Sequence, residues 1–357
     1  MTSIPPAALP DSLQEALTRA LAEAGQERQV VALRPMADTG LAHHHVWLER
    51  DDKDWVARLP KQSQMDLAPR DNLAYQAACF ARAAEGGHAP ALHGVLPPSA
   101  ALPRGGLLVE AVRGRPARLP EDLPAIAEAL AALHALPVPD PAARPPLRAP
   151  ADPWHAMRDE IATQAEHLAD AGLPADMIST IRAELAALPT RLGGDATTRL
   201  ISFDAHPGNF LIRDDGRAVL VDLEKCRYGL PGFDLAHASL YTSTTWDPGS
   251  HAVLELPELV DFHRRWMGRT GLRAVESLLA CRRAMWLWSL TWCAKWRASQ
   301  ARARDAQARG EDWSAELSDA ALVAHVRDRV DHYLSLAAID HVRREFDALA
   351  TALEKDA

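Results

Sequence analysis

The sequence changes character near residue 112. Before that point, short β-prone runs alternate with turns rich in Gly, Pro and Asp, whereas most of the later sequence has apolar residues at three- and four-residue spacing. The β-prone runs lie at residues 30–33, 46–48, 55–59 and 107–112, and one helix is expected between them at residues 71–85. We therefore predict an α+β chain with two lobes. The small β-rich lobe spans residues 1–112, with a hinge at residues 109–112, and the larger, mostly helical lobe spans residues 113–357.

Length, charge and cysteine spacing argue against several classes of protein, among them nucleic-acid-binding and disulfide-stabilised proteins. A chain of 357 residues is long enough for two unequal lobes. Its formal charge of −9 argues against binding nucleic acid along the whole surface. Four scattered cysteines without a Cys-x-x-Cys pair indicate neither a zinc site nor a disulfide framework. The first residues do not resemble a secretory signal, and the apolar run 284–294 is too short to span a membrane. We expect a cytoplasmic protein that binds neither membrane nor nucleic acid, as a monomer or a dimer.

The segment ISFDAHPGNFLIRDDGRAVLVD, residues 201–222, carries the chemistry. It predicts a β-hairpin that turns at Asp-Asp-Gly, with Asp204 and Asn209 on the loop entering it and Asp222 at its exit. Because a hairpin returns its ends to neighbouring positions, Asn209 and Asp222 can bind one metal ion while Asp204 lies close to an acceptor. Phosphoryl transfer requires a carboxylate to accept a proton and oxygen ligands for Mg²⁺.

FDAHPGNFLI and VLVDLEK resemble a motif of the aminoglycoside phosphotransferases and choline kinases, His-Gly-Asp-x-His-x-x-Asn followed by two hydrophobic strands and Ile-Asp-x-Glu. The resemblance implies a bilobal protein-kinase-like fold and transfer of phosphate from ATP, with Mg²⁺, to a hydroxyl of a small, amine-bearing molecule. It makes Asp204 the catalytic base, Asn209 and Asp222 the Mg²⁺ ligands, and His206 a residue that orders the loop. GLPGFDL, similar to the family's Gly-x-Pro-x-x-Asp-Leu, makes Asp234 the carboxylate that braces the catalytic loop.

The resemblance extends to the nucleotide side. ADTGLAHHHVWLE is similar to the turn over the ATP phosphates, WVARLP to the strand with the phosphate-binding residue, LLVEAVRG to the adenine hinge and LAALHALP to the helix after it. It implies these ATP-binding residues: Thr39, Gly40, Leu41, Ala42, Arg58, Glu110 and Val112.

The sequence departs from the family pattern in three features, which involve four residues. Ser202 and Phe203 replace the His-Gly before the base, Arg58 stands where a Lys is often found, and Gln76 stands at the place of its Glu partner. Because an Arg–Gln pair lacks the ion pair of a Lys–Glu clamp, we expect weaker ATP binding or a substitute acid. The candidates for that acid are Asp66 and Asp71.

Aromatic and charged residues elsewhere have two interpretations each. Trp288, Trp292 and Trp296 form a stripe on one helix face, which favours core packing, although Trp246, Asp247, Trp288 and Trp292 could instead form a pocket for a cationic or flat substrate. The run 43–45, His-His-His, is predicted to contact solvent or the phosphate loop, since neighbours on a strand face opposite ways. Glu224 and Lys225 could bind metal or substrate, but a surface charge pair is favoured.

Two other functions remain open at the sequence level. The chain could be a non-catalytic, kinase-like nucleotide-binding protein, or a kinase or nucleotidyltransferase that acts on a protein. No long segment resembling an activation loop separates Asp222 from Asp234, which favours a small acceptor. The sequence leaves open the identity of the acceptor and the choice between ATP and GTP.

Overall fold

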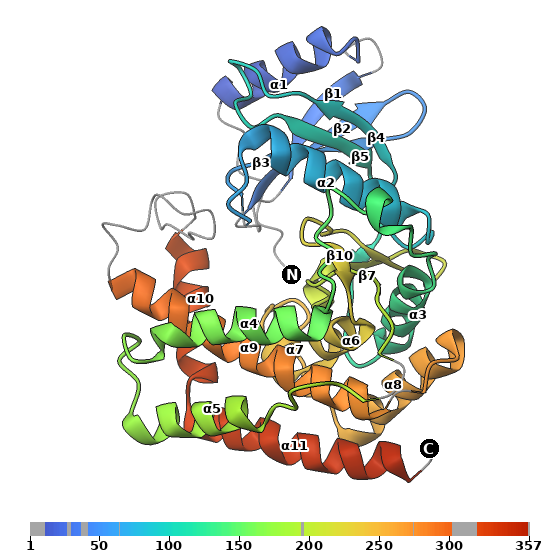
Figure 1. Ribbon diagram of the computed structural model, residues 1–357. Helices are drawn as coiled ribbons and strands as arrows, with labels where there is room; N and C mark the ends of the chain where they lie inside the picture. The colour runs from blue at the N-terminus through green and yellow to red at the C-terminus, as the bar shows by residue number, and fades with distance from the viewer. Residues whose placement is uncertain are drawn as a thin grey trace.

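The computed structural model describes residues 11–26, 30–36, 42–63, 65–193, 196–273, 275–301 and 320–355. It divides into a small lobe built on a sheet and a larger lobe built mainly of helices (Figure 1). In chain order the small lobe holds α1 (Asp11–Glu23), β1 (Val30–Pro35), β2 (His43–Arg50), β3 (Trp55–Pro60), α2 (Pro69–Ala84), β4 (Leu92–Leu96) and β5 (Gly106–Glu110). The predicted fold class, α+β and bilobal, is confirmed.

The small-lobe sheet is antiparallel, with strand order β1-β2-β3-β5-β4. Helices lie on both of its faces. Leu17 and Leu21 of α1 join a buried cluster with Val46 and Ala57, whereas Phe80 of α2 belongs to a second cluster that also contains strand residues of the sheet. The second cluster continues into the large lobe, so α2 connects the two parts through apolar contacts. The strand β4 was not among the predicted runs, because a Gly and a His interrupt its apolar pattern.

The large lobe begins with short strands and continues in helices. Its elements are β6 (Arg115–Pro116), α3 (Leu123–His134), η2 (Pro141–Ala143), α4 (Pro153–Ala165), η3 (Glu166–Leu168), α5 (Ala175–Ala187), β7 (Arg199–Ile201), η4 (Pro207–Asn209), β8 (Phe210–Ile212), β9 (Ala218–Leu220), β10 (Arg227–Gly229), α6 (Pro231–Ser239), α7 (Tyr241–Thr244), α8 (Leu256–Thr270), α9 (Val275–Ala301), α10 (Ala320–Tyr333) and α11 (Leu336–Glu354). The predicted hairpin is β8 and β9, paired from Phe210↔Leu220 to Ile212↔Ala218.

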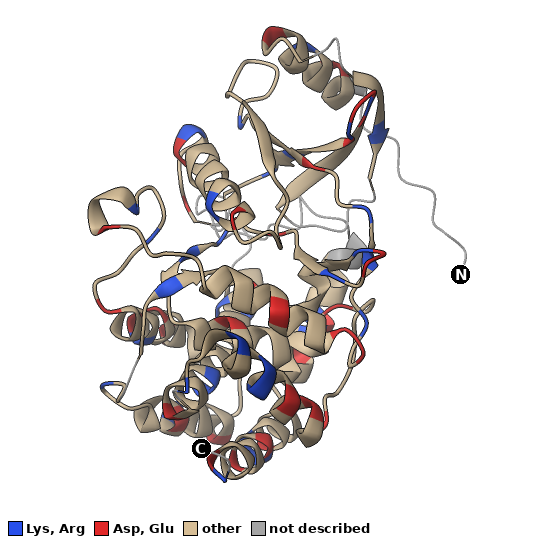
Figure 2. Cartoon of the chain, turned by 90° about the vertical axis from the view of Figure 1, so that its right-hand side faces the viewer, with Lys and Arg blue, Asp and Glu red and all other residues tan. Residues whose placement is uncertain are grey.

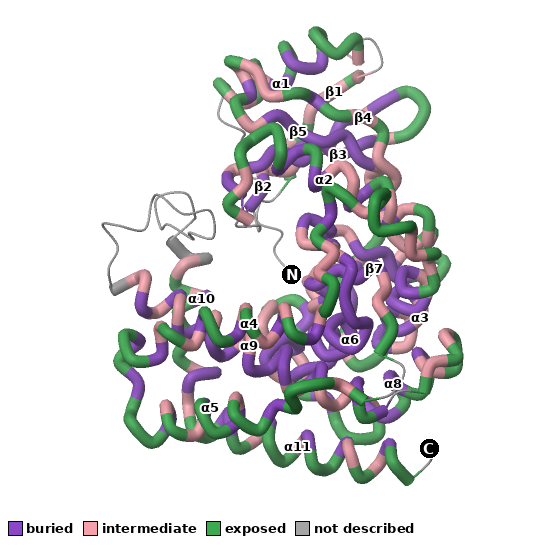
Figure 3. The backbone as a smooth tube through the Cα atoms, in the orientation of Figure 1, coloured by how far each residue is buried: buried purple, intermediate pink, exposed green. Residues whose placement is uncertain are grey.

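The core of the large lobe forms around α9 and α6, which Figure 3 shows mostly in the colour of buried residues. The apolar run 284–294 lies within α9 and is largely buried, as expected for a core helix. No helix among the described residues combines the length and apolar character needed to cross a membrane. The four cysteines are free and buried. Figure 2 shows acidic and basic residues interspersed over both lobes.

Candidate active site

The loop that carries Asp204 follows β7, and its backbone is hydrogen-bonded to Asp234 of α6. The Asp234 carboxylate is fully buried and accepts hydrogen bonds from the backbone N–H groups of Ser202 (2.7 Å) and Phe203 (2.8 Å). It also accepts one from His134 Nε2 (3.1 Å). Trp266 Nε1 donates to the other ring nitrogen of His134 (3.0 Å), which extends the network to α8. Three donors on one buried carboxylate fix the direction in which the loop leaves the strand.

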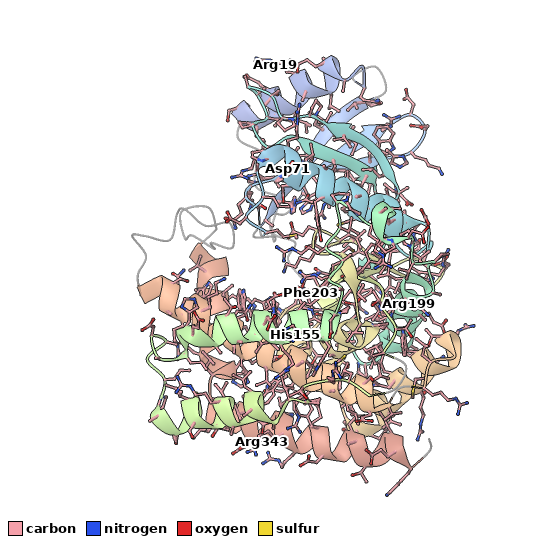
Figure 4. All side chains as sticks on the ribbon, viewed as in Figure 1. Arg19, Asp71, His155, Arg199, Phe203 and Arg343 are labelled. Atoms are coloured by element: carbon pink, nitrogen blue, oxygen red, sulfur yellow. The ribbon has the colours of Figure 1, made fainter. Side chains whose placement is uncertain are left out.

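Phe203 has a positive φ of 59°, a conformation that favours glycine. Its strain is offset by contacts. Its backbone N–H is bonded to Asp234, and its ring lies under the Arg227 guanidinium at 3.6 Å and against the edge of Trp288 at 5.6 Å between centroids. Figure 4 labels Phe203 at the upper side of the large lobe, toward the small lobe. The contacts of the Phe203 ring therefore stabilise a left-handed backbone conformation directly before Asp204, at the position where the family pattern has Gly.

Two hydrogen bonds to backbone carbonyl oxygens bring together the chain segments of Asp204, Asn209 and Asp222. Asn209 Nδ2 donates to the carbonyl oxygen of Asp204 (2.8 Å), and the N–H of Val221, directly before Asp222, donates to the carbonyl oxygen of Asn209 (2.9 Å). The Asn209 side chain thus uses its nitrogen as a hydrogen-bond donor within the loop, and the predicted role as a metal ligand would fall to its amide oxygen. The two ends of the hairpin meet as the sequence predicts.

Of the three carboxyl groups near this junction, Asp204 and Asp222 have lowered pKa values and Glu224 has a raised one. Burial opposes ionisation of Asp222, but Arg58, His43 and Lys225 outweigh it and hold the pKa of that carboxyl well below its ordinary value. Burial is likewise outweighed at Asp204 by Lys225 and the nearby imidazoles, so its pKa is also lowered. By contrast, burial and the Asp222 charge raise the pKa of Glu224 to about 8.

Arg58 of β3 reaches across to the large lobe. Its Nη2 donates to Asp222 Oδ1 (2.8 Å), and its Nη1 donates to the carbonyl oxygen of Val221 (3.1 Å) and to His45 Nε2 (3.2 Å). The guanidinium is therefore at the junction of the lobes, beside a predicted metal ligand. His43 and His45 lie on the same face of β2 with ring centroids 6.0 Å apart, as the alternation of strand side chains requires.

Gln76 forms its hydrogen bonds with His43 and Glu224, whereas the sequence placed it as the partner of Arg58. Its Oε1 accepts a hydrogen bond from His43 Nε2 (3.0 Å), and its Nε2 donates to Glu224 Oε2 (3.3 Å). Instead of the expected ion pair, Arg58 pairs with Asp222 of the large lobe, and Gln76 lies in a separate buried chain of hydrogen bonds from His43 to Glu224.

The favoured interpretation of Glu224 and Lys225 as a surface pair is wrong. Glu224 is only 3% exposed, and the Lys225 ammonium lies 2.9 Å from Asp204 Oδ2. The prediction failed because a charged pair after a strand is usually solvated, and the sequence gives no sign that the two lobes close over it. His237 of α6 is a second neighbour that sequence reasoning missed, with Nε2 at 3.9 Å from Asp204 Oδ1.

The remaining predicted residues are distributed as follows. Ala42 is buried and its carbonyl oxygen accepts from the Lys61 N–H (2.8 Å), while Thr39, Gly40 and Leu41 lie outside the described residues.

Glu110 Oε1 accepts from Arg213 Nη2 (2.7 Å), which links the end of β5 to the strand pair β8–β9, and Val112 follows it as a buried residue. His206 precedes η4, and its ring lies 6.0 Å from that of His237.

The predicted substrate residues lie on the helical side of the Asp204 loop. A Cβ atom on Gly208 would come within 2.6 Å of Asp247 Oδ2, so the Asp247 carboxylate rests against the short helix that ends in Asn209. Trp246 packs edge-to-face on Trp292 with centroids 5.9 Å apart. Trp288 donates from Nε1 to Glu160 (2.8 Å) and contacts Phe203. Trp288 and Trp292 are partly buried against the core, as the favoured packing interpretation expects, and the same contacts bring Trp288 close to the loop.

Comparison with known proteins identifies relatives of this arrangement. The model of the phosphotransferase enzyme family matches residues 33–268, about two thirds of the chain. No curated protein sequence matches the chain. Among solved structures, it is similar to a putative aminoglycoside phosphotransferase from Ralstonia eutropha, with a TM-score of 0.62 and 14% identity over 88% of this chain and 98% of that one.

Two further structures show the same fold. A choline/ethanolamine kinase family protein from Mesorhizobium loti has a TM-score of 0.58 at 18% identity, covering 95% of this chain and 99% of its own. The choline kinase LicA from Streptococcus pneumoniae has a TM-score of 0.53 at 14% identity, covering 88% and 99%. At these identities the likeness concerns the fold.

Proposed function

The chain belongs to the phosphotransferase enzyme family, and from this we propose that it transfers the γ-phosphate of ATP to a hydroxyl group of a small, amine-bearing molecule. The observation that carries the proposal is the junction of Asp204, Asn209 and Asp222 at the two ends of one hairpin, with hydrogen bonds to backbone carbonyl oxygens that join these segments. We propose that residues 1–112 form the ATP-binding lobe, with its hinge at residues 109–112, and that residues 113–357 form the catalytic and acceptor-binding lobe.

Asp204 is proposed as the base that accepts the proton of the acceptor hydroxyl. Its carboxyl is ionised at neutral pH, since its pKa is lowered, and its Oδ1 lies 3.9 Å from His237 Nε2, beyond hydrogen-bonding distance. As the acceptor oxygen forms its bond to the γ-phosphorus, the bond to the bridging oxygen of the nucleotide breaks and the proton passes to Asp204. Asp234 and His206 would keep the loop in place during this step.

The residues at the hairpin fit Mg²⁺. Asp222 is ionised, and with Oδ1 bound by Arg58 it retains a second carboxylate oxygen, while Asn209 retains its amide oxygen. One carboxylate and one amide oxygen, completed by phosphate oxygens and water, make a donor set of the hard type that Mg²⁺ prefers. A metal ion held there would neutralise charge that develops on the phosphates. Among the described residues, no group of three His, Cys, Asp or Glu side chains offers a competing site.

The nucleotide side would use Arg58 for the phosphates and the backbone near Glu110 and Val112 for the base, with residues 39–42 above the phosphates. Support for Arg58 comes from its position on Asp222 at the lobe junction. Because guanidinium groups bind phosphate oxygens well, Arg58 can exchange part of its hold on Asp222 for a phosphate when nucleotide binds.

The acceptor side would lie near Asp247 and the aromatic residues Trp246, Trp288 and Trp292. Asp247 is a partly exposed carboxylate against the Asn209 turn, which suits a cationic amine. Indole faces also attract cations. The family relatives whose names state a substrate act on aminoglycosides, macrolides or choline, and an amine-bearing acceptor is consistent with this group.

The test is a phosphorylation screen with MgATP across amino alcohols, amino sugars and aminoglycosides, comparing the wild type with Asp204→Ala. We expect a product heavier by one phosphate that the variant does not form. A product heavier by AMP would replace the proposal with nucleotidyl transfer. MgATP binding without turnover across the screen and with protein acceptors would identify a non-catalytic nucleotide-binding protein.

A further inference from the structure

A lysine lies on the proposed catalytic base. The Lys225 ammonium is 2.9 Å from Asp204 Oδ2, whereas Oδ1 of the same carboxylate faces His237 Nε2 at 3.9 Å, beyond hydrogen-bonding distance. The two oxygens of the base therefore have different surroundings. One is fixed by a cation, and the other is available to accept a proton.

The backbone around Lys225 holds this contact in place. The strands β7 and β10 pair with Arg227 opposite Ile201, so the residues just before β10 run alongside the loop that follows β7. A turn closed by the Cys226 N–H on the Leu223 carbonyl oxygen (3.0 Å) brings the chain from Asp222 to this point. Lys225 thus joins the segment of the predicted metal ligand to the loop of the base.

The ammonium is shielded but not sealed from solvent, with 18% of its side chain exposed. Burial lowers the pKa of a lysine, but the charge and hydrogen bond of Asp204, with the charge of Asp222, outweigh that effect and raise the pKa of Lys225. It is therefore a permanent cation at neutral pH. An ammonium has three N–H donors, and Asp204 engages one of them.

We propose that Lys225 is a catalytic residue of this chain, whose ammonium stays anchored on Asp204 and donates a hydrogen bond to the phosphoryl group as it moves to the acceptor. The inference rests on the proposed function. The acceptor oxygen forms the new O–P bond, the bond from phosphorus to the bridging oxygen breaks with its electron pair leaving on the nucleoside diphosphate, and the proton goes to Asp204. Lys225 exchanges no electrons or protons.

The geometry favours an effect on the transition state. The phosphoryl group must pass beside the base, because the acceptor hydroxyl that it joins is bound to that base. A cation fixed beforehand at this position stabilises charge on the phosphoryl oxygens most when the group has left the nucleotide. Arg58 is bonded to Asp222 and Lys225 to Asp204, so each of the two ionised carboxylates has its own cation.

The experiment compares wild type, Lys225→Met, Lys225→Arg and the control Lys53→Met, which removes an exposed ammonium in the β2–β3 turn. Two quantities are measured with known probes. The first is steady-state turnover of MgATP, with water as the acceptor and with any acceptor found in the screen. The second is the affinity for MgADP with and without aluminium fluoride, which imitates a phosphoryl group in transfer. Circular dichroism and melting temperature check folding, and Lys225→Gln replaces the Met variant if the latter does not fold.

We expect Lys225→Met to lower kcat by about 100-fold with KM for MgATP changed less than about threefold, as for removal of one transition-state donor. It should bind MgADP normally but lose most of the gain in affinity that aluminium fluoride gives the wild type. Lys225→Arg should recover part of both, and Lys53→Met should behave as wild type.

Three results would overturn the proposal. Unchanged kcat and an unchanged aluminium fluoride effect in Lys225→Met would remove Lys225 from catalysis while Asp204→Ala remains inactive. Equal losses of MgADP and MgADP–aluminium fluoride affinity would show that Lys225 only maintains the site. Absence of turnover in the wild type, with no difference from Asp204→Ala, would contradict the proposed function and with it this inference.

Discussion

Buried ionisable groups have different charge states in two parts of the candidate site, the catalytic side with Asp204 and Asp222 and the side of α2 with His43 and Glu224. On the catalytic side Asp204 and Asp222 stay ionised because Lys225 and Arg58 each lie within hydrogen-bonding distance of one of them. On the side of α2 the buried groups are neutral. Burial, with Asp222, raises the pKa of Glu224 to about 8, and burial, with Arg58, lowers the pKa of His43 to about 3.

This difference follows from what each side has to do. The proposed base and the proposed metal ligand both need ionised carboxylates, and each has a cation beside it. The link between α2 and the large lobe requires only that polar groups be satisfied, and a neutral chain from His43 through Gln76 to Glu224 does this without an ion pair. We expect substitutions on the charged side to change activity and those on the neutral side to change stability.

The largest effect is expected at Asp222. Asp222→Asn removes the charge of the proposed metal ligand and partner of Arg58, and MgATP turnover should fall by about 10³-fold, equivalent to about 4 kcal/mol. The increase in melting temperature that MgATP gives over ATP with EDTA should disappear as well. Asp214→Asn, an exposed residue of the hairpin turn, is the matched control and should change neither quantity. Full turnover in Asp222→Asn would break the contrast between the two sides.

The next effect tests the support beneath the catalytic loop. In Asp234→Asn an amide nitrogen replaces one oxygen and faces a donor, either a backbone N–H or His134, so the free energy of unfolding should fall by about 3 kcal/mol. Urea denaturation measures it. Asp261→Asn, on the exposed face of α8 in a 3.6 Å pair with Arg265, should change stability by less than about 0.5 kcal/mol. Equal small losses at both positions would mean that Asp234 does not brace the loop.

A smaller effect concerns the strained residue before the base. Because L residues at positive φ are strained and glycine is not, Phe203→Gly should be more stable than Phe203→Ala by about 1.5 kcal/mol, although both lose the packing of the ring. Phe210 is the matched control, being buried in β8 with φ −110°. There the Gly variant should be the less stable one, by about 1 kcal/mol. The same order at both positions would show that Phe203 is not strained.

The fold and the meeting of the three residues proposed for catalysis were accessible from the sequence because they depend on local patterns. The change from β-prone runs to helical periodicity predicted the lobes, and the spacing of Asp204, Asn209 and Asp222 around one turn predicted that they meet. Both follow from short-range geometry, in which a hairpin returns its ends to the same place.

The contacts between the lobes could not be predicted in this way. The bonds of Arg58 to Asp222 and of Gln76 to Glu224 join residues 164 and 148 positions apart in the sequence. The burial of Glu224 and Lys225 depends on how closely α2 approaches the large lobe, which no local pattern determines. Phe203 was noted as a departure from Gly, but its compensation by Arg227 and Trp288 is a tertiary effect.

The smallest expected effect probes the neutral side through pH. In the unfolded chain His43 titrates at its ordinary pKa of 6.5, whereas in the folded protein burial, with Arg58, lowers it to about 3. The unfolded state therefore binds the extra proton first, and the stability that the neutral imidazole contributes is present above pH 6.5 and lost as the pH falls toward 3. Between pH 7.5 and 5.5 this loss amounts to about 1 kcal/mol.

Urea denaturation at the two pH values should show that the free energy of unfolding declines more steeply for wild type than for His43→Gln by this amount. His155→Gln, on the exposed surface of α4, should decline like the wild type. If His43→Gln declines as steeply as the wild type, His43 is charged in the folded protein, and the division into a charged and a neutral side does not hold.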